Sequence, residues 1–162
     1  MKQQGYGRLL FTTSASGLFG NFGQTNYGAA KMGLVGLSNV LAVEGARYGI
    51  TANVIAPAAR TRMTEGLLGP LADAMDPDLI VPMALYLVSK ECEITHEIYS
   101  AMGGRYARVF IGVTPGWFSG AGAQPTVEAI ADRIDAIRDQ EGYAVPNNIG
   151  ADMDAFMGLL NA

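Results

Sequence analysis

Cysteine, histidine and lysine are scarce in this chain of 162 residues, which has one Cys, one His and three Lys. The lone Cys92 has no partner for an internal disulfide bond. Cys92 and His96 together fall short of the four nitrogen and sulfur ligands that a structural zinc ion takes. Because a disulfide framework is absent, we expect a reducing compartment, and because the ligands are too few, we expect no metal site. We also expect a cytoplasmic location.

Basic runs and long apolar runs are also missing. With 11 basic and 15 acidic residues the net charge is −4, so the chain lacks the positive surface that holds a nucleic-acid backbone or an anionic membrane. The first apolar run, at residues 9–11, is shorter than a signal-peptide core or a membrane span. We therefore expect neither a nucleic-acid nor a membrane partner. The 49% apolar content predicts a soluble domain with a packed core.

Alternating strand-like and helix-like segments predict an α/β fold with a parallel sheet. The expected strands are residues 8–13, 50–56 and 97–101, and the expected helices are residues 26–47, residues 77–89 and one that Thr126 caps. Between the first strand and the first helix, the glycine-rich residues 14–24 predict a loop. Pro57 is expected to end the second strand, because proline cannot donate to the ladder.

The expected helix at residues 26–47 has a cap, an apolar stripe and a glycine stop. Asn26 is the predicted N-cap and Gly49 the terminator. The predicted core-facing stripe is Ala30, Leu34, Leu37 and Leu41. Glycine inside a helix costs about 1 kcal/mol relative to alanine. A close backbone approach to a neighbouring element is therefore expected along this helix, whose glycines include Gly28, Gly33 and Gly36.

The pattern changes after Gly104. Residues 107–113 are strand-like, residues 114–125 are rich in turn formers, and the tail from Tyr143 has no clear pattern. We predict that residues 1–105 form one domain and that residues 106–162 are a C-terminal extension packed on it.

Ser14, Tyr27 and Lys31 are the candidate catalytic residues. Tyr27 and Lys31 are four residues apart on the expected helix, so their side chains share one face. An ammonium group at that distance favours the phenolate form of a tyrosine, which can then act as a general acid or base. Ser14 follows a parallel strand, where α/β sheets place ligand sites, and its hydroxyl can bind a substrate oxygen. Together these roles describe carbonyl reduction or alcohol oxidation.

The spacing of tyrosine and lysine is not sufficient by itself. Tyr86 and Lys90 have the same spacing, but no glycine-rich loop precedes them and Asp73 stands where a serine is required. A serine hydrolase is set aside, because Ser14 has neither the GxSxG elbow nor a nearby histidine.

The segments SASG from Ser14, YGAAK from Tyr27 and NVIAP from Asn53 resemble the second half of the short-chain dehydrogenase/reductase family. The similarity extends from about Arg8 to Trp117. It is strongest to the (3R)-hydroxyacyl-CoA dehydrogenase module of peroxisomal multifunctional enzymes and their bacterial relatives.

The resemblance implies a role for each matching residue. Tyr27 would be the catalytic acid or base, and Lys31 its partner and a contact to the nicotinamide ribose. Ser14 would orient the substrate. Pro57 and Thr61 would lie against the nicotinamide, although Pro57-Ala58 stands where the family has Pro-Gly. The implied cofactor is NAD or NADP, and the implied substrate is a 3-hydroxyacyl-CoA or a similarly apolar alcohol.

The family's glycine-rich turn for the cofactor pyrophosphate has no counterpart in the chain and would precede Met1. The implied fold is therefore the second half of a doubly wound, Rossmann-like parallel sheet with a C-terminal extension. The alternative is a non-catalytic remnant, or a split-enzyme subunit that acts only with a partner carrying the N-terminal half. Because the strand at residues 8–13 would be an unpaired edge in such a half, we expect the isolated chain to be marginally stable or to self-associate into a homo-oligomer.

Overall fold

The computed structural model describes residues 1–62, 64, 66 and 69–161. They divide into two compact units, Met1–Val109 and Phe110–Ala162. The elements of the first unit are η1 (Lys2–Gln4), β1 (Gly7–Thr12), α1 (Ala15–Phe19), α2 (Thr25–Gly45), η2 (Ala46–Tyr48), β2 (Ile50–Ala58), η3 (Gly69–Ala74), η4 (Pro77–Leu79), α4 (Val81–Val88), β3 (Ile98–Met102) and β4 (Arg105–Val109), where η marks a 3-10 turn.

The sheet of the first unit has the strand order β1-β2-β3-β4. β1, β2 and β3 are parallel, and β4 returns antiparallel to β3. The predicted α/β fold and its three parallel strands are confirmed, each strand within two residues of its expected bounds. β4 ends at Val109 because its partner β3 begins at Ile98, directly opposite. Residues 110–113, expected to continue the strand, extend past the start of β3, and Val113 instead forms an isolated bridge with Ala144.

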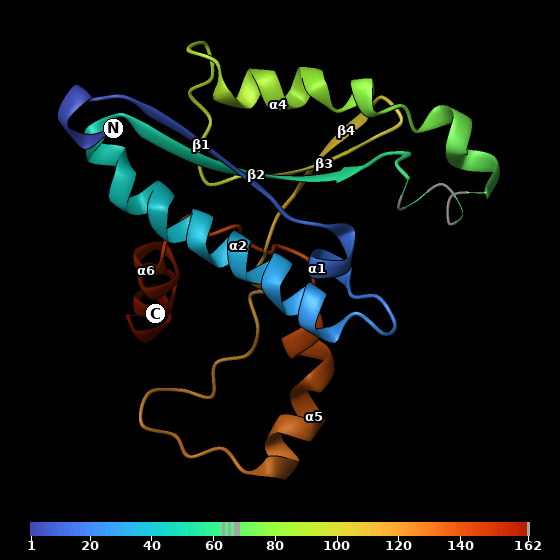
Figure 1. Ribbon diagram of the computed structural model, residues 1–162. Helices are drawn as coiled ribbons and strands as arrows, with labels where there is room; N and C mark the ends of the chain where they lie inside the picture. Colours follow the sequence, from blue (N-terminus) through green and yellow to red (C-terminus); the bar gives the residue numbers. More distant parts are fainter. Residues whose placement is uncertain (63, 65, 67–68, 162) are drawn as a thin grey trace. The chain divides into compact units, whose positions relative to one another are not determined.

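Helices cover both faces of this sheet, with α2 on one face and α4 on the other (Figure 1). Val35 of α2 packs against Val54 and Ile98, from β2 and β3, to form the core on the first face. On the other face Leu87 of α4 is fully buried, and the Arg8 guanidinium donates to the Ser89 carbonyl at 3.1 Å. Because successive residues of a strand point to opposite faces of the sheet, the sheet packs against α2 on one face and against α4 on the other.

The start of α2 and the segment before it differ from the sequence prediction. Residues 15–19 form the short helix α1 within the expected loop, because the Ser14 hydroxyl accepts a hydrogen bond from the Ser16 amide and caps it. Asn26 is not the N-cap of α2: the helix begins at Thr25, after Gln24.

The predicted apolar stripe of α2 is also wrong, since Leu37 is 47% exposed and Ala30 is exposed. The buried positions are Val35, Ser38, Ala42 and Gly45. α2 carries apolar residues on several sides, so periodicity alone does not select the inner face. Small residues determine which face of α2 is buried, because a side chain at Gly45 would lie 3.0 Å from the Ile50 carbonyl oxygen.

Pro57 lies inside β2 rather than after it. Alternation along the strand points its nitrogen toward β1, and the β1 to β2 pairing stops at Thr12 and Ile55. No partner in β1 therefore requires the missing amide hydrogen.

The expected helix at residues 77–89 is divided. Asp76 caps the short turn η4, and α4 then begins with Pro82 in its first turn. Proline is tolerated there because the first helical amides lack partners anyway.

The second unit has two helices, α5 (Val127–Arg138) and α6 (Ile149–Leu160). Thr126 caps α5 through the Ala129 amide, as predicted. Asn148 caps α6, a helix in the tail where the sequence has no clear pattern. An isolated bridge joins Val113 and Ala144, and the rings of Phe110 and Tyr143 stack at 5.5 Å.

Asn53 of β2 holds the segment before β3 in place. Its fully buried side-chain amide donates to the Ile94 carbonyl at 2.7 Å, and its oxygen accepts from the Glu97 amide at 3.2 Å. Both polar groups of this buried side chain are thus paired with backbone, which sets the start of β3.

We predict that Asn53→Ala lowers the free energy of unfolding by about 2–4 kcal/mol, because the Ile94 carbonyl and the Glu97 amide lose their side-chain partner and a buried side chain is truncated. Urea denaturation measures the change. The control is Asn21→Ala, which removes one exposed hydrogen bond to Gln24 and should cost less than about 0.5 kcal/mol. Equal losses in the two variants would contradict the structural role of Asn53.

Candidate active site

The carboxyl ends of β1 and β2 bring the predicted site residues to one edge of the sheet. Ser14 follows β1, and Thr61 follows β2. Because the two strands are parallel neighbours, their carboxyl ends lie at the same edge, which is where open α/β sheets bind ligands. Helix α2, which carries Tyr27 and Lys31, begins beyond that edge and packs back against the sheet (Figure 1).

Ser14 is held by its role as the cap of α1. Its oxygen accepts from the Ser16 amide at 3.2 Å. A hydroxyl has one donor and two acceptor positions, so this cap occupies one acceptor position and leaves the O–H group able to donate. Ser14 can therefore bind a carbonyl or hydroxyl oxygen at the end of β1.

Tyr27 and Lys31 share one face of α2, as their spacing predicts. The Lys31 Nζ lies 5.7 Å from the centre of the Tyr27 ring, within the range of a cation–π contact. The Tyr27 side chain is 43% exposed, so its hydroxyl is accessible to a ligand. The structure confirms that the phenol and the ammonium group are neighbours.

Two hydrogen bonds tie Lys31 to β1. Its Nζ donates to the Thr12 carbonyl at 3.0 Å, and its own carbonyl accepts from the hydroxyl of buried Thr13 at 2.7 Å. An ammonium group has three donors, so one N–H group anchors Lys31 to the strand and the others point elsewhere.

Close packing of α1 on α2 brings Ser14 toward this pair. A side chain at Gly17 would lie 2.8 Å from the Lys31 Cβ, and one at Gly28 would lie 3.3 Å from the Ser16 carbonyl oxygen. The expected close approach at Gly28 is thus confirmed. Gly33 and Gly36 do not contribute to it, because a side chain added at either would have nothing within 4 Å.

Thr61 and Pro57 stand at the β2 side of the same edge. The Thr61 amide donates to the Thr64 hydroxyl at 2.8 Å, and that hydroxyl donates to the Ala59 carbonyl at 2.8 Å. These bonds shape the chain after β2 into a turn. Pro57, in the strand itself, is half-buried.

The second tyrosine and lysine pair does not form a comparable site. α4 ends at Val88, so Lys90 lies beyond the helix that carries Tyr86. A spacing of four residues places two side chains on one face only while the helix continues. Local geometry therefore distinguishes the pair Tyr27 and Lys31 from the pair Tyr86 and Lys90.

Other titratable groups form no metal site among the residues that the structure describes, where no three His, Cys, Asp or Glu side chains gather. Cys92 is fully buried, and its thiol lies 3.9 Å from the Ile94 carbonyl. His96 has a left-handed backbone with φ of 66° and donates its amide to the Ala52 carbonyl.

A third tyrosine, Tyr99, lies in β3, opposite Arg108 of β4. Its hydroxyl donates to the Glu97 carboxylate, which also pairs with Arg108 at 3.2 Å. Partial burial, reinforced by this carboxylate, raises the pKa of Tyr99 above its usual range. Tyr99 therefore favours the neutral phenol and is a poor candidate for a general base.

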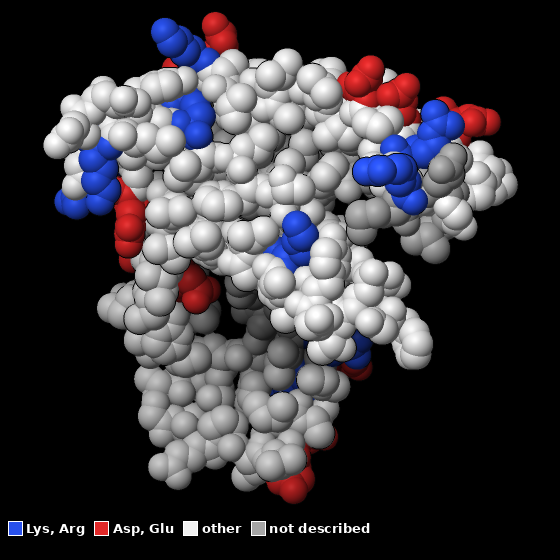
Figure 2. All heavy atoms as spheres, viewed as in Figure 1, with Lys and Arg blue, Asp and Glu red and all other residues white. Residues whose placement is uncertain are grey.

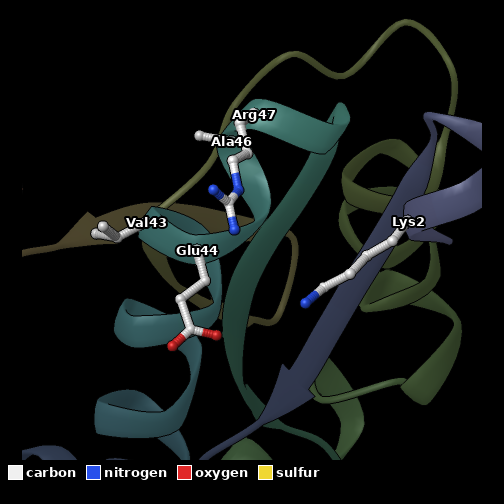
Figure 3. A pocket seen from close by; sticks show the side chains of 5 residues that line it. All are labelled: Lys2, Val43, Glu44, Ala46 and Arg47. Atoms are coloured by element: carbon white, nitrogen blue, oxygen red, sulfur yellow. The ribbon is translucent and has the colours of Figure 1, made fainter.

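An open hollow lies at the opposite end of α2, between that helix and η1. Figure 3 shows its lining residues, with Lys2 reaching from η1 toward Glu44 and Arg47, beside Val43 and Ala46. Val43 is 16 residues along the helix from Tyr27, or about 24 Å at the α-helical rise. This hollow is therefore separate from the candidate active site.

Figure 2 shows Lys and Arg side chains in small separate groups, interspersed with Asp and Glu, on the face it displays. Within the described ranges, none of the helices combines the length and apolar character that crossing a bilayer requires.

One feature beside the site was missed from the sequence. The turn between α1 and α2 presents Phe22, whose side chain is 102% exposed. The sequence signal for this feature is a single aromatic residue between Asn21 and Gly23, within the segment predicted to be a loop.

Comparison with known proteins gives a consistent result. The sequence profile of the short chain dehydrogenase family matches residues 1–68. A Mycobacterium tuberculosis protein named as a short-chain type dehydrogenase/reductase is 46% identical over 149 residues, or 89% of this chain. An acetoacetyl-CoA reductase of an Acinetobacter species is 38% identical over 118 residues, or 65% of the chain.

The structure of full-length peroxisomal multifunctional enzyme type 2 from Drosophila melanogaster matches 99% of the chain, with a TM-score of 0.86 and 31% identity. The chain spans 50% of the mycobacterial relative, 48% of the Acinetobacter reductase and 30% of the Drosophila protein.

We predict that Gly17→Ala destabilises the chain by about 1–3 kcal/mol, because the added methyl group forces α1 away from α2. Gly36→Ala is the matched control. It lies in α2 with open space around it, so it should stabilise the chain by up to about 1 kcal/mol. Urea denaturation of both variants checks the opposite signs. Stabilisation by Gly17→Ala would show that the close approach at Gly17 is not required.

Proposed function

We propose that this chain, whose residues 1–68 match the profile of the short-chain dehydrogenase family, carries the catalytic residues of an alcohol oxidoreductase. The proposed reaction is the interconversion of an alcohol and a ketone by hydride transfer. The observation that carries the proposal is the grouping of Ser14, Tyr27 and Lys31 at the carboxyl edge of β1.

Tyr27 is the proposed proton donor and acceptor. In ketone reduction its hydroxyl gives a proton to the substrate oxygen, and in alcohol oxidation the phenolate takes that proton back. The Lys31 ammonium group next to the ring stabilises the phenolate. Ser14, fixed by its capping bond, donates its O–H to the same substrate oxygen and orients it.

The chain's donors fit the nicotinamide side of NAD or NADP, which when bound supplies or accepts the hydride. Lys31, with N–H groups beyond the one bound to Thr12, would hold the ribose hydroxyls beside Tyr27. Thr61 would hold the carboxamide, and Pro57 would lie against the ring. An ammonium group and a hydroxyl at one sheet edge suit such neutral, oxygen-rich groups.

For the substrate we propose a 3-hydroxyacyl-CoA or a similarly apolar small alcohol. The similarity to an acetoacetyl-CoA reductase supports this class. The absence of charged side chains between Arg8 and Lys31 also supports it, because this segment surrounds Ser14 and Tyr27 and suits an uncharged substituent. The single Cys92, buried in the core, is consistent with a cytoplasmic location, which we also propose.

A second candidate function is that of a subunit acting together with another polypeptide. β1 is an edge strand of the described sheet, although its apolar residues Leu9, Leu10 and Phe11 are half-buried. Unpaired backbone groups on such an edge favour pairing with another strand. The pairing partner would be a second copy of the chain or a polypeptide that supplies the dinucleotide-binding half.

We expect Tyr27→Phe to lower kcat for oxidation of 3-hydroxybutyryl-CoA by about 10²–10⁴-fold, since it removes the transferred proton and leaves the ring packed. Absorbance of NADH or NADPH gives the rate. The matched control is Tyr86→Phe, which changes the exposed tyrosine of the other pair and should leave kcat within about twofold. Near-normal turnover of Tyr27→Phe would refute the assignment.

Hydrogen exchange tests the second candidate. The Gly7 and Thr13 amides donate to carbonyls at Gly49 and Ile55, so odd-numbered β1 amides point toward β2 and even-numbered ones toward the open edge. In dilute solution the Leu10 amide should exchange at least about tenfold faster than the Phe11 amide. Pairing of β1 would slow Leu10 as concentration rises or a partner is added. A Leu10 amide that is fast under every condition would exclude edge pairing.

A further inference from the structure

The turn between α1 and α2 exposes two aromatic side chains next to the candidate active site. Phe22, in the turn, is 102% exposed, and Phe19, at the end of α1, is 71% exposed. Complete exposure of a phenylalanine is unfavourable in water, because burying that side chain is worth about 1.5–3 kcal/mol. These rings add nothing to the core of the first unit.

Hydrogen bonds hold the turn that presents Phe22. The Gly20 amide donates to the Ser16 carbonyl at 3.1 Å, and the Gln24 amide donates to the Asn21 carbonyl at 3.3 Å. The Asn21 side chain also donates to the Gln24 side chain at 3.2 Å. These bonds join the turn to the end of α1 and to the start of α2.

Two glycines flank the tip of this turn in conformations that other residues rarely adopt. Gly20 has φ of 82° and Gly23 has φ of 75°. Both are in open space, so the positive φ angles serve the path of the chain rather than close packing. That path directs the chain out and back around Asn21 and Phe22.

The turn connects the residues of the proposed site. Ser14 caps the helix that precedes it, and Tyr27 lies in the first turn of the helix that follows. Figure 1 shows the turn at the end of α2 where α1 packs. A ligand oxygen bound to Ser14 and Tyr27 would thus lie at the base of this turn.

The surroundings of the turn favour an apolar ligand group. No Asp, Glu, Lys, Arg or His stands between Arg8 and Lys31. A charged substituent would find no counterion in this segment, whereas a hydrocarbon chain would bury the exposed face of Phe22 as well as its own surface.

We propose that Phe22 is a specificity-determining residue that covers the hydrocarbon chain of the substrate while its oxygen is bound at Ser14 and Tyr27. The inference rests on the proposed oxidoreductase function and extends it to a preference for long acyl chains. Phe22 touches only the part of the substrate that does not react, so it should affect the choice of substrate more than the chemical step.

Substrate chain length provides the test. For the full chain with NAD or NADP, kcat/KM is measured for 3-hydroxybutyryl-CoA and 3-hydroxydecanoyl-CoA. Phe22→Ala should lower the ratio of the long to the short substrate by about tenfold, the loss expected when the hydrocarbon chain no longer buries a ring. Phe22→Leu, which keeps an apolar side chain, should stay within about threefold of the parent.

The control variant is Leu85→Ala. Leu85 is 62% exposed and lies on α4, on the other face of the sheet (Figure 1), so its removal should leave the ratio unchanged. Calorimetric binding of decanoyl-CoA and butanoyl-CoA repeats the comparison without turnover, and Leu85→Ala should bind both as the parent does.

The possible results separate the two proposals. If the parent oxidises both substrates and Phe22→Ala retains the parent's ratio in rate and in binding, the role of Phe22 is refuted and the oxidoreductase function stands. If the parent neither oxidises nor binds any acyl thioester, the proposed function fails, and the role of Phe22 fails with it. A selective loss of the long substrate in Phe22→Ala, restored by Phe22→Leu, supports both.

Discussion

The close approach of α1 to α2 is the constraint on which the candidate site depends. At Gly17 and Gly28 the two helices come so near that a single methyl group would meet the neighbouring chain. A glycine in a helix costs conformational free energy, and here that cost permits Ser14 at the start of α1 to lie beside the helix that carries Tyr27. Larger residues would widen the gap between the hydroxyl and the phenol, and two groups that act on one oxygen have to be positioned together.

Lys31 links this helix pair to the sheet and is also part of the proposed chemistry. Its carbonyl binds Thr13, and its ammonium group binds the carbonyl of Thr12. Odd-numbered β1 residues bond to β2, so the Thr12 carbonyl points to the open side of the strand. Lys31 therefore satisfies an edge group that β2 cannot reach. Because Lys31 anchors α2 to the end of β1, it also fixes where its positive charge lies relative to the Tyr27 phenol. One side chain therefore both positions the helix and supplies the charge.

Local patterns were sufficient to predict part of this structure. Buried β-branched runs gave the three parallel strands, and the spacing of Tyr27 and Lys31 gave their shared face, because both depend on the chain's own periodicity. Features decided by partners were not predictable in this way. Pro57 is accepted inside β2 only because β1 ends earlier, and α2 buries Val35 rather than Leu37 because small residues on that side let it approach β2. The helix α1 was missed because its glycine content obscured the capping role of Ser14.

The two tyrosine and lysine pairs show what converts a spacing into a candidate site. Both have four-residue spacing, and both tyrosines are more than 40% exposed. Around Tyr27 the helix continues past Lys31, β1 ends beneath the pair, and the helix-capping Ser14 stands at the start of α1. Around Tyr86 the helix stops two residues later at Val88, and the pair loses its common face. Since a proton transfer requires donor, acceptor and charge to be held in one geometry, only the first pair meets that requirement, and the difference arises from the strand and the helix packing around it.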